Sequence, residues 1–168
     1  MKASIQQDSY KNKVSNKLST SDKILAETNY ENATFKNRNS NPVVMNKDQK
    51  EKLGIPCLYI KSNKQSGIII IYFHANGEDI NRCRNICKYM SITMNAHVLA
   101  MEYPGFSVYK HGDECSEATV KRDADIIFQY LKNEIKIHPK DIIIIGRSLG
   151  SGIATYLANK YPRICCLV

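Results

Sequence analysis

A Gly-Arg-Ser-Leu-Gly sequence at positions 146–150 combines a serine hydroxyl with two flanking glycines. It follows a short run of isoleucines ending at Ile145, which is typical of a buried strand, and it precedes a helix-like segment over 151–160. A G-x-S-x-G sequence between a strand and a helix predicts a sharp turn that exposes the serine as a nucleophile. We therefore expect Ser148 to attack a carbonyl carbon.

The residues beside this serine have roles of their own in that hypothesis. Bulky side chains at Gly146 and Gly150 would block the turn, and the helix that follows offers the free backbone N–H of Leu149 to a developing oxyanion. The alternative is that both glycines are ordinary turn residues and that Ser148 only belongs to the cap of the helix. The flanking strand and helix favour the nucleophile.

The elements that must position this turn alternate along the chain. We expect strands over 55–61, 67–73, 97–102, 141–145 and 164–168, and helices over 80–94, 116–135 and 151–160. This alternation predicts an α/β fold with a mostly parallel sheet and helices on both faces. Ligands of such sheets bind beyond the carboxyl ends of the strands, where loops 74–79, 103–113 and 146–150 should meet.

Two helix starts carry capping signals. Asp79 is well placed to cap the helix over 80–94, because its carboxylate can accept from free N–H groups of the first turn. Ser116 with Thr119 makes only a poor capping box, since glutamate or glutamine is usual at the second position. The sequence therefore defines the start of the helix over 116–135 only to within a few residues.

Composition restricts the partners. The chain has 168 residues and a formal net charge of +8. This charge is spread along the sequence without a basic stripe or an aromatic platform motif, so we expect no nucleic-acid partner. No apolar run is long enough to cross a bilayer, and the first residues lack the apolar segment of a secretory signal. We expect a cytoplasmic protein, peripheral contact with membranes being a second expectation, and leave the oligomeric state open.

The composition of the first 50 residues indicates the domain organisation. Residues 1–50 are rich in Lys, Asn, Ser and Thr, and we expect a disordered or loosely attached extension with a short strand near 42–45. One domain should follow over 51–168.

The six cysteines lack zinc-binding spacing and are expected to be reduced core residues, so no metal or other cofactor is expected.

Three motifs in this order resemble the α/β-hydrolase superfamily. They are a His-containing loop after a buried strand, the Glu-Tyr-Pro-Gly-Phe-Ser sequence at 102–107, and Gly-Arg-Ser-Leu-Gly. The chain looks most like the branch that contains the acyl-protein thioesterases (depalmitoylases), and it is also similar to serine aminopeptidase-like relatives. The resemblance covers about residues 55–168.

The resemblance implies roles for the loop over 74–79. The oxyanion hole would combine the N–H of Leu149 with that of Asn76 or, as a second choice, Ala75. The family usually has His-Gly-Asn-Ala where this chain has His-Ala-Asn-Gly. Alanine restricts the backbone more than glycine, so we expect Gly77 to supply the lost freedom. His74 is expected to be a structural loop residue.

The loop that begins at Tyr103 departs from the family pattern through its proline. Tyr103 and Phe106 are expected to form one wall of the substrate pocket. The alternative is a turn that holds two buried aromatic rings, and the sequence leaves both open.

Two residues that the resemblance implies, the acid and the histidine of a catalytic triad, are missing after Ser148. In this fold the triad acid and histidine follow the serine, yet no Asp, Glu or His follows Ser148. His97 and His138 precede strands and should lie at the opposite end of the sheet, and His111 does not match a family base position. We therefore expect the N-terminal part of a C-terminally truncated hydrolase that is nearly unreactive by itself.

These observations lead to alternative functions. The first is a serine hydrolase that cleaves acyl ester or thioester bonds of a small molecule or an acylated protein through an acyl-enzyme on Ser148. The second is a catalytically inactive hydrolase-fold protein that binds partners or acts as a scaffold. A serine aminopeptidase-type peptidase ranks below the esterase, because no acidic pocket for a substrate amine is evident.

Overall fold

The computed structural model describes residues 54–110 and 114–167 together with a short strand at Ala26–Glu27. These residues form a six-stranded sheet with the strand order β1-β2-β4-β3-β5-β6. The strands are β1 (Ala26–Glu27), β2 (Cys57–Ile60), β3 (Ile69–Phe73), β4 (His97–Met101), β5 (Ile142–Gly146) and β6 (Cys165–Leu167).

The sheet is mostly parallel, as expected. Only the β2–β4 pair is antiparallel among the pairings of the described strands. Phe73, the last residue of β3, is in register with Met101 of β4 and with Gly146 of β5. The three central strands therefore end at the same edge, and the loops that follow them meet there.

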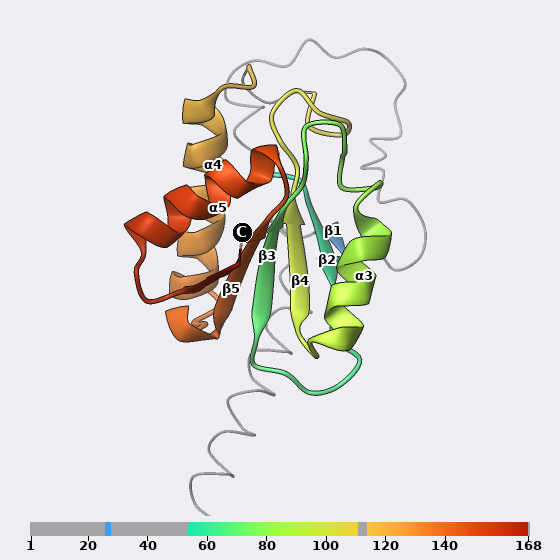
Figure 1. Ribbon diagram of the computed structural model, residues 1–168, viewed down its shortest axis with the longest axis vertical. Coiled ribbons are helices and arrows are strands. Elements are labelled where there is room, and N and C mark those ends of the chain that lie inside the picture. Colours follow the sequence, from blue (N-terminus) through green and yellow to red (C-terminus); the bar gives the residue numbers. More distant parts are fainter. Residues whose placement is uncertain (1–25, 28–53, 111–113, 168) are drawn as a thin grey trace, which may run out of the picture.

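Helices cover both faces of this sheet (Figure 1). α3 (Arg84–Thr93) lies on one face, and α4 (Glu117–Asn133) and α5 (Leu149–Lys160) lie on the other. β3 is apolar at every position and fully buried, because its successive side chains point into two separate cores. Ile71 packs into the core under α4 and α5, whereas Ile70 packs into the core under α3. The α/β fold is confirmed.

The cap of α4 is better than its sequence indicates. The hydroxyl oxygen of Ser116 accepts from the backbone N–H of Thr119 at 3.1 Å, and the hydroxyl oxygen of Thr119 accepts from the N–H of Ser116 at 2.9 Å. The expectation of a poor capping box is therefore wrong, because the threonine hydroxyl takes the place of the usual glutamate carboxylate.

α3 begins later in the chain than the sequence predicts. The helix begins at Arg84 instead of Ile80, and its N-cap residue is Cys83, which makes no side-chain cap. Asp79 instead accepts from the backbone N–H groups of Asn81 and Arg82 at 2.8 and 2.9 Å. Its carboxylate thus closes a separate turn ahead of the helix, and the helical periodicity over 80–83 did not distinguish the two.

β1 lies inside the segment that we expected to be a loosely attached extension, and it pairs in parallel with β2. Most of that segment, including the expected strand near 42–45, lies outside the described residues. Cys57, Cys83 and Cys87 are buried core thiols, but Cys115 is exposed, contrary to the expectation for the cysteines as a group. Within the described ranges, no helix has the length and apolar character needed to cross a membrane.

Candidate active site

Ser148 occupies a strained turn between β5 and α5. Its backbone has φ 52° and ψ −115°, a left-handed conformation that non-glycine residues adopt at a cost of about 1–3 kcal/mol. The side chain is exposed and makes no cap hydrogen bond with α5. Ser148 is the N-cap residue of α5 by position, but its side chain does not cap the helix, and the expected strained turn is confirmed.

Close backbone contacts explain the two glycines of the turn. A Cβ atom on Gly146 would lie 2.3 Å from the carbonyl oxygen of Gly150, and a Cβ atom on Gly150 would lie 2.1 Å from the carbonyl oxygen of Phe73. Neither contact can be relieved by a side-chain rotation, since the crowded atoms belong to the backbone. Any larger residue at these positions would push α5 away from the sheet.

Hydrogen bonds hold the turn against the neighbouring strand. The N–H of Arg147 donates to the carbonyl oxygen of Phe73 at 3.0 Å, and the N–H of Gly150 donates to the carbonyl oxygen of Arg147 at 2.9 Å. No described residue accepts from the N–H of Leu149, which lies in the first turn of α5. This donor remains available to an oxygen atom bound beside Ser148.

The loop over 74–79 follows β3 and reaches the same edge of the sheet. Glu78 closes it, because its backbone N–H donates to the carbonyl oxygen of Ala75 at 3.0 Å and its carboxylate accepts from the N–H of Ala75 at 3.2 Å. The N–H of Ala75 is therefore engaged. Asn76 is exposed, and its N–H has no acceptor among the described residues.

An ion pair joins this loop to the serine turn. The carboxylate of Glu78 contacts the guanidinium of Arg147, the residue immediately before Ser148. Tyr72, a buried residue of β3, lies near this carboxylate, and its pKa is raised to about 12 by burial and by the charge of Glu78. The structure thus brings the loop next to the turn that holds Ser148, as the sequence predicts.

Gly77 does not have the role that we expected. Its backbone is outside the left-handed region, and no atom lies within 4 Å of the place where a Cβ would stand. Ala75 is not left-handed either. The loop therefore needs no special backbone freedom at Gly77 to compensate for alanine at position 75.

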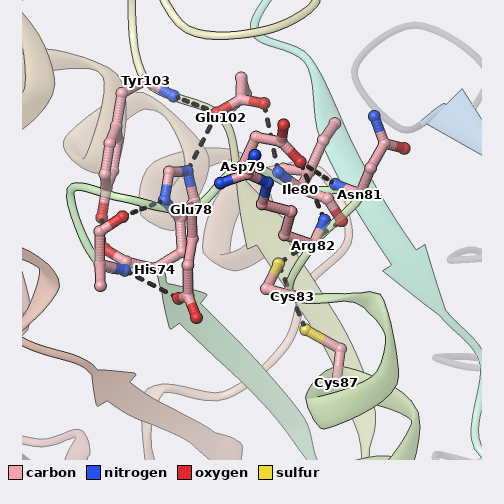
Figure 2. Close-up of polar contacts among 11 residues, drawn as sticks. His74, Glu78, Asp79, Ile80, Asn81, Arg82, Cys83, Cys87, Glu102 and Tyr103 are labelled. Carbon is pink, nitrogen blue, oxygen red and sulfur yellow. Dashed lines mark hydrogen bonds and ion pairs between the residues drawn. The ribbon is translucent and has the colours of Figure 1, made fainter.

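The buried carboxylate of Glu102 holds the loop over 74–79 in place through hydrogen bonds (Figure 2). Glu102 follows β4, and both its side chain and that of His74 are completely buried. Its Oε1 accepts from Nε2 of His74 at 3.0 Å and from the N–H of Tyr103 at 3.1 Å, and its Oε2 accepts from the N–H of Ile80 at 3.2 Å. One carboxylate thus connects β3, β4 and the turn before α3.

His74 is held on both ring nitrogens. Its Nδ1 lies 2.9 Å from the carbonyl oxygen of Ala75, while Nε2 contacts Glu102. Both ring nitrogens are thus engaged within the loop and with Glu102, which is compatible with the structural role expected for His74.

Tyr103 is a brace and does not line an open pocket. It is fully buried, and its hydroxyl donates to the carbonyl oxygen of His74 at 2.7 Å. Burial raises the pKa of Tyr103, so the hydroxyl keeps the proton that it donates. Phe106 packs edge-on against this ring, with centroids 5.6 Å apart. Tyr103 therefore fits the turn with buried aromatic rings, whereas Phe106 is only partly buried and its place in a pocket wall stays a prediction.

Sequence reasoning gave no role to Glu78, Glu102 or Arg147. Glu102 and Arg147 directly follow β4 and β5, and Glu78 lies in the loop after β3, so all three are charged residues at the carboxyl edge where ligands of such sheets bind. Their pairing could not have been found, because Glu78 and Arg147 are 69 positions apart and both lie in turns.

The other described histidines lie away from Ser148. His97 is buried at the start of β4, where the hydroxyl of Tyr59 lies 2.7 Å from its Nδ1. His138 caps a 3-10 turn ahead of β5 by accepting from the N–H of Lys140. His111 lies outside the described residues. Within the described part of the chain, no side chain hydrogen-bonds the Ser148 hydroxyl, and no cluster of His, Cys, Asp and Glu could hold a metal ion.

No protein-family model matches the chain. Among curated proteins, it is similar to alpha/beta hydrolase domain-containing protein 17C of Mus musculus, with 23% identity over 105 residues that cover 62% of this chain and 32% of the relative. The chain thus spans about a third of the length of the curated relatives it matches.

Solved structures share the fold. BpoC of Mycobacterium tuberculosis, provisionally assigned as a non-heme bromoperoxidase, matches with a TM-score of 0.52 and 12% identity over 67% of this chain and 38% of that chain. The Francisella virulence factor BioJ matches with a TM-score of 0.50 and 16% identity over 64% of this chain and 36% of that chain. The expected resemblance to the superfamily is confirmed by these matches and by the curated relative.

Proposed function

The chain has the α/β-hydrolase fold, and we propose that Ser148 is the nucleophile of a serine hydrolase that cleaves acyl esters or thioesters. The observation that carries this proposal is the backbone of Ser148, which is left-handed although the residue is not a glycine. Such strain persists only where the surrounding structure enforces it, and it gathers at functional sites. Here it presents an exposed hydroxyl at the carboxyl edge of the sheet.

The proposed reaction has two steps. The oxygen of Ser148 forms a bond to the acyl carbon while its proton passes to a base, and the C–O or C–S bond breaks to release an alcohol or a thiol. Water then attacks the acyl-enzyme, which releases a carboxylic acid and restores the serine. The acyl group belongs to a small molecule or to an acylated protein.

The negative oxygen formed in each step needs two donors. Leu149 and Asn76 supply them in this proposal, since the N–H of Ala75 already donates to Glu78. A donor of this kind contributes about 10²–10³ in rate.

The reaction also needs a base that the described residues do not supply to Ser148. Without one, the serine hydroxyl is a weak nucleophile at neutral pH. The same observation favours a second candidate function, in which the fold binds a partner or serves as a scaffold without catalysis.

Hydrolysis assays separate the two candidates. The protein expressed from its complete gene is assayed with p-nitrophenyl esters of increasing acyl length and with the matching thioesters. The hydrolase proposal predicts turnover that Ser148→Ala abolishes and Thr155→Ala preserves, Thr155 being an exposed hydroxyl further along α5. Turnover that survives Ser148→Ala, or no turnover of any acyl substrate, would contradict it.

A further inference from the structure

We propose that Glu78 is the positioning residue of the oxyanion loop and that it acts by fastening this loop to the nucleophile turn through Arg147. This inference rests on the proposed nucleophile and deepens it. It names the side chain that decides which backbone N–H groups face the reacting oxygen.

The first step of the argument is the double contact between Glu78 and Ala75. The backbone N–H of Glu78 donates to the carbonyl oxygen of Ala75, and Oε2 of the same residue accepts from the N–H of Ala75. Both polar groups of the Ala75 backbone thus bind Glu78, and the carbonyl oxygen also lies 2.9 Å from Nδ1 of His74. Because the N–H of Ala75 is occupied, Asn76 is the one of these two candidate donors whose N–H can face a substrate.

The second step is the contact with Arg147. Oε1 of Glu78 pairs with Nη1 of Arg147, while the backbone N–H of Arg147 is bound to the last residue of β3. Arg147 precedes Ser148 directly, so any shift of the loop relative to the turn would have to break this pair. The pair fixes the distance between the two halves of the oxyanion hole.

The third step is the charge balance. A carboxylate beside a developing oxyanion would oppose it, but the guanidinium of Arg147 neutralises Glu78 at contact distance. The side chain of Glu78 is 19% exposed and that of Arg147 is 63% exposed. An ion pair this open to solvent adds little to folding stability, so its removal should change the chemistry far more than the melting temperature.

The test measures the rate of Ser148 modification by a fluorophosphonate, which forms a Ser148 O–P bond, breaks the P–F bond and releases fluoride and a proton. In the protein expressed from its complete gene, we expect Glu78→Ala to lower the maximal inactivation rate about 100-fold and to leave the probe's inhibition constant unchanged, as for a misplaced oxyanion donor. Glu78→Gln keeps an acceptor for Ala75 and should lose only about tenfold. Both variants should melt within about 5 °C of the wild type.

The matched control is another ion pair of the same kind. Glu117 pairs with Lys121 on α4, away from the serine turn, so Glu117→Ala should leave the inactivation rate unchanged. Arg147→Ala combined with Glu78→Ala should be no slower than Glu78→Ala alone, because both act through one contact.

The outcomes separate this inference from the proposed function. A wild-type protein that the probe does not modify at Ser148 would overturn both. Modified wild type with an unchanged rate in Glu78→Ala, or a loss in Glu78→Ala that Glu78→Gln does not partly restore, would overturn the role of Glu78 and leave the nucleophile standing.

Discussion

The carbonyl oxygen of Phe73 lies directly against the backbone of Gly150, only 2.1 Å from the place where a Cβ atom would stand. Phe73 ends β3, and Gly150 belongs to the first turn of α5. This contact seats the start of the helix on the strand that leads into loop 74–79. The serine turn and the candidate oxyanion loop are therefore parts of one packed unit.

Replacing the glycine tests that contact. Gly150→Ala is expected to destabilise the protein by about 3 kcal/mol, because the added methyl meets backbone atoms that no rotamer change can move. Gly77→Ala, where the new methyl meets nothing within 4 Å, should stay within about 0.5 kcal/mol of the wild type. Urea unfolding of both variants measures the difference, and equal midpoints would contradict the close approach.

The strained backbone of Ser148 predicts that glycine fits this position better than alanine does. Ser148→Gly should be more stable than Ser148→Ala by about 1 kcal/mol, because glycine adopts φ 52° without steric cost. Neither variant can form an acyl-enzyme. Thermal unfolding of the pair checks the prediction, and a Ser148→Ala variant at least as stable as Ser148→Gly would show that the turn is unstrained.

The brace beneath the loop can be tested through one hydroxyl. Tyr103→Phe should cost about 1–3 kcal/mol, because the carbonyl oxygen of His74 loses its buried donor. Tyr89→Phe is a suitable control, since Tyr89 is 64% exposed. Equal stability of the two variants by urea unfolding would show that the Tyr103 hydroxyl does not stabilise the loop.

Acid should destabilise the fold through His97. Burial lowers the pKa of this residue to about 4 from its ordinary 6.5, so the unfolded chain takes up a proton before the folded one does. Its contribution of about 3 kcal/mol is complete above pH 6.5 and is lost as the pH falls towards 4. Urea unfolding across this range checks the loss.

The control for this effect replaces the titrating ring. His97→Gln should lower stability at neutral pH and flatten its dependence between pH 6.5 and 4, because the new side chain cannot bind a proton. The same pH dependence in both proteins would place the acid sensitivity elsewhere.

Much of this fold is predictable because its signals are local. The isoleucine-rich run over 69–73 cannot be exposed on either face, and the spacing of the glycines around Ser148 fits few structures other than a strand-to-helix turn. The resemblance to the α/β-hydrolase superfamily also predicts that this buried strand comes before the serine turn in the chain.

The rest depends on contacts between distant positions. Nothing near Glu78 indicates that it faces Arg147, and nothing near Glu102 indicates that a carboxylate can be buried there without penalty. The three donors that Glu102 receives come from different parts of the chain. Local periodicity also continued the helix of α3 back to Ile80, where the carboxylate of Asp79 stabilises a separate turn.

The most direct measurement of the central claim locates the residue that a fluorophosphonate modifies. After reaction with the protein expressed from its complete gene, mass spectrometry of the peptides should find the phosphonyl group on Ser148. The group should be absent from Ser148→Ala and present in Thr155→Ala. A modified residue other than Ser148, or modification that persists in Ser148→Ala, would contradict the account.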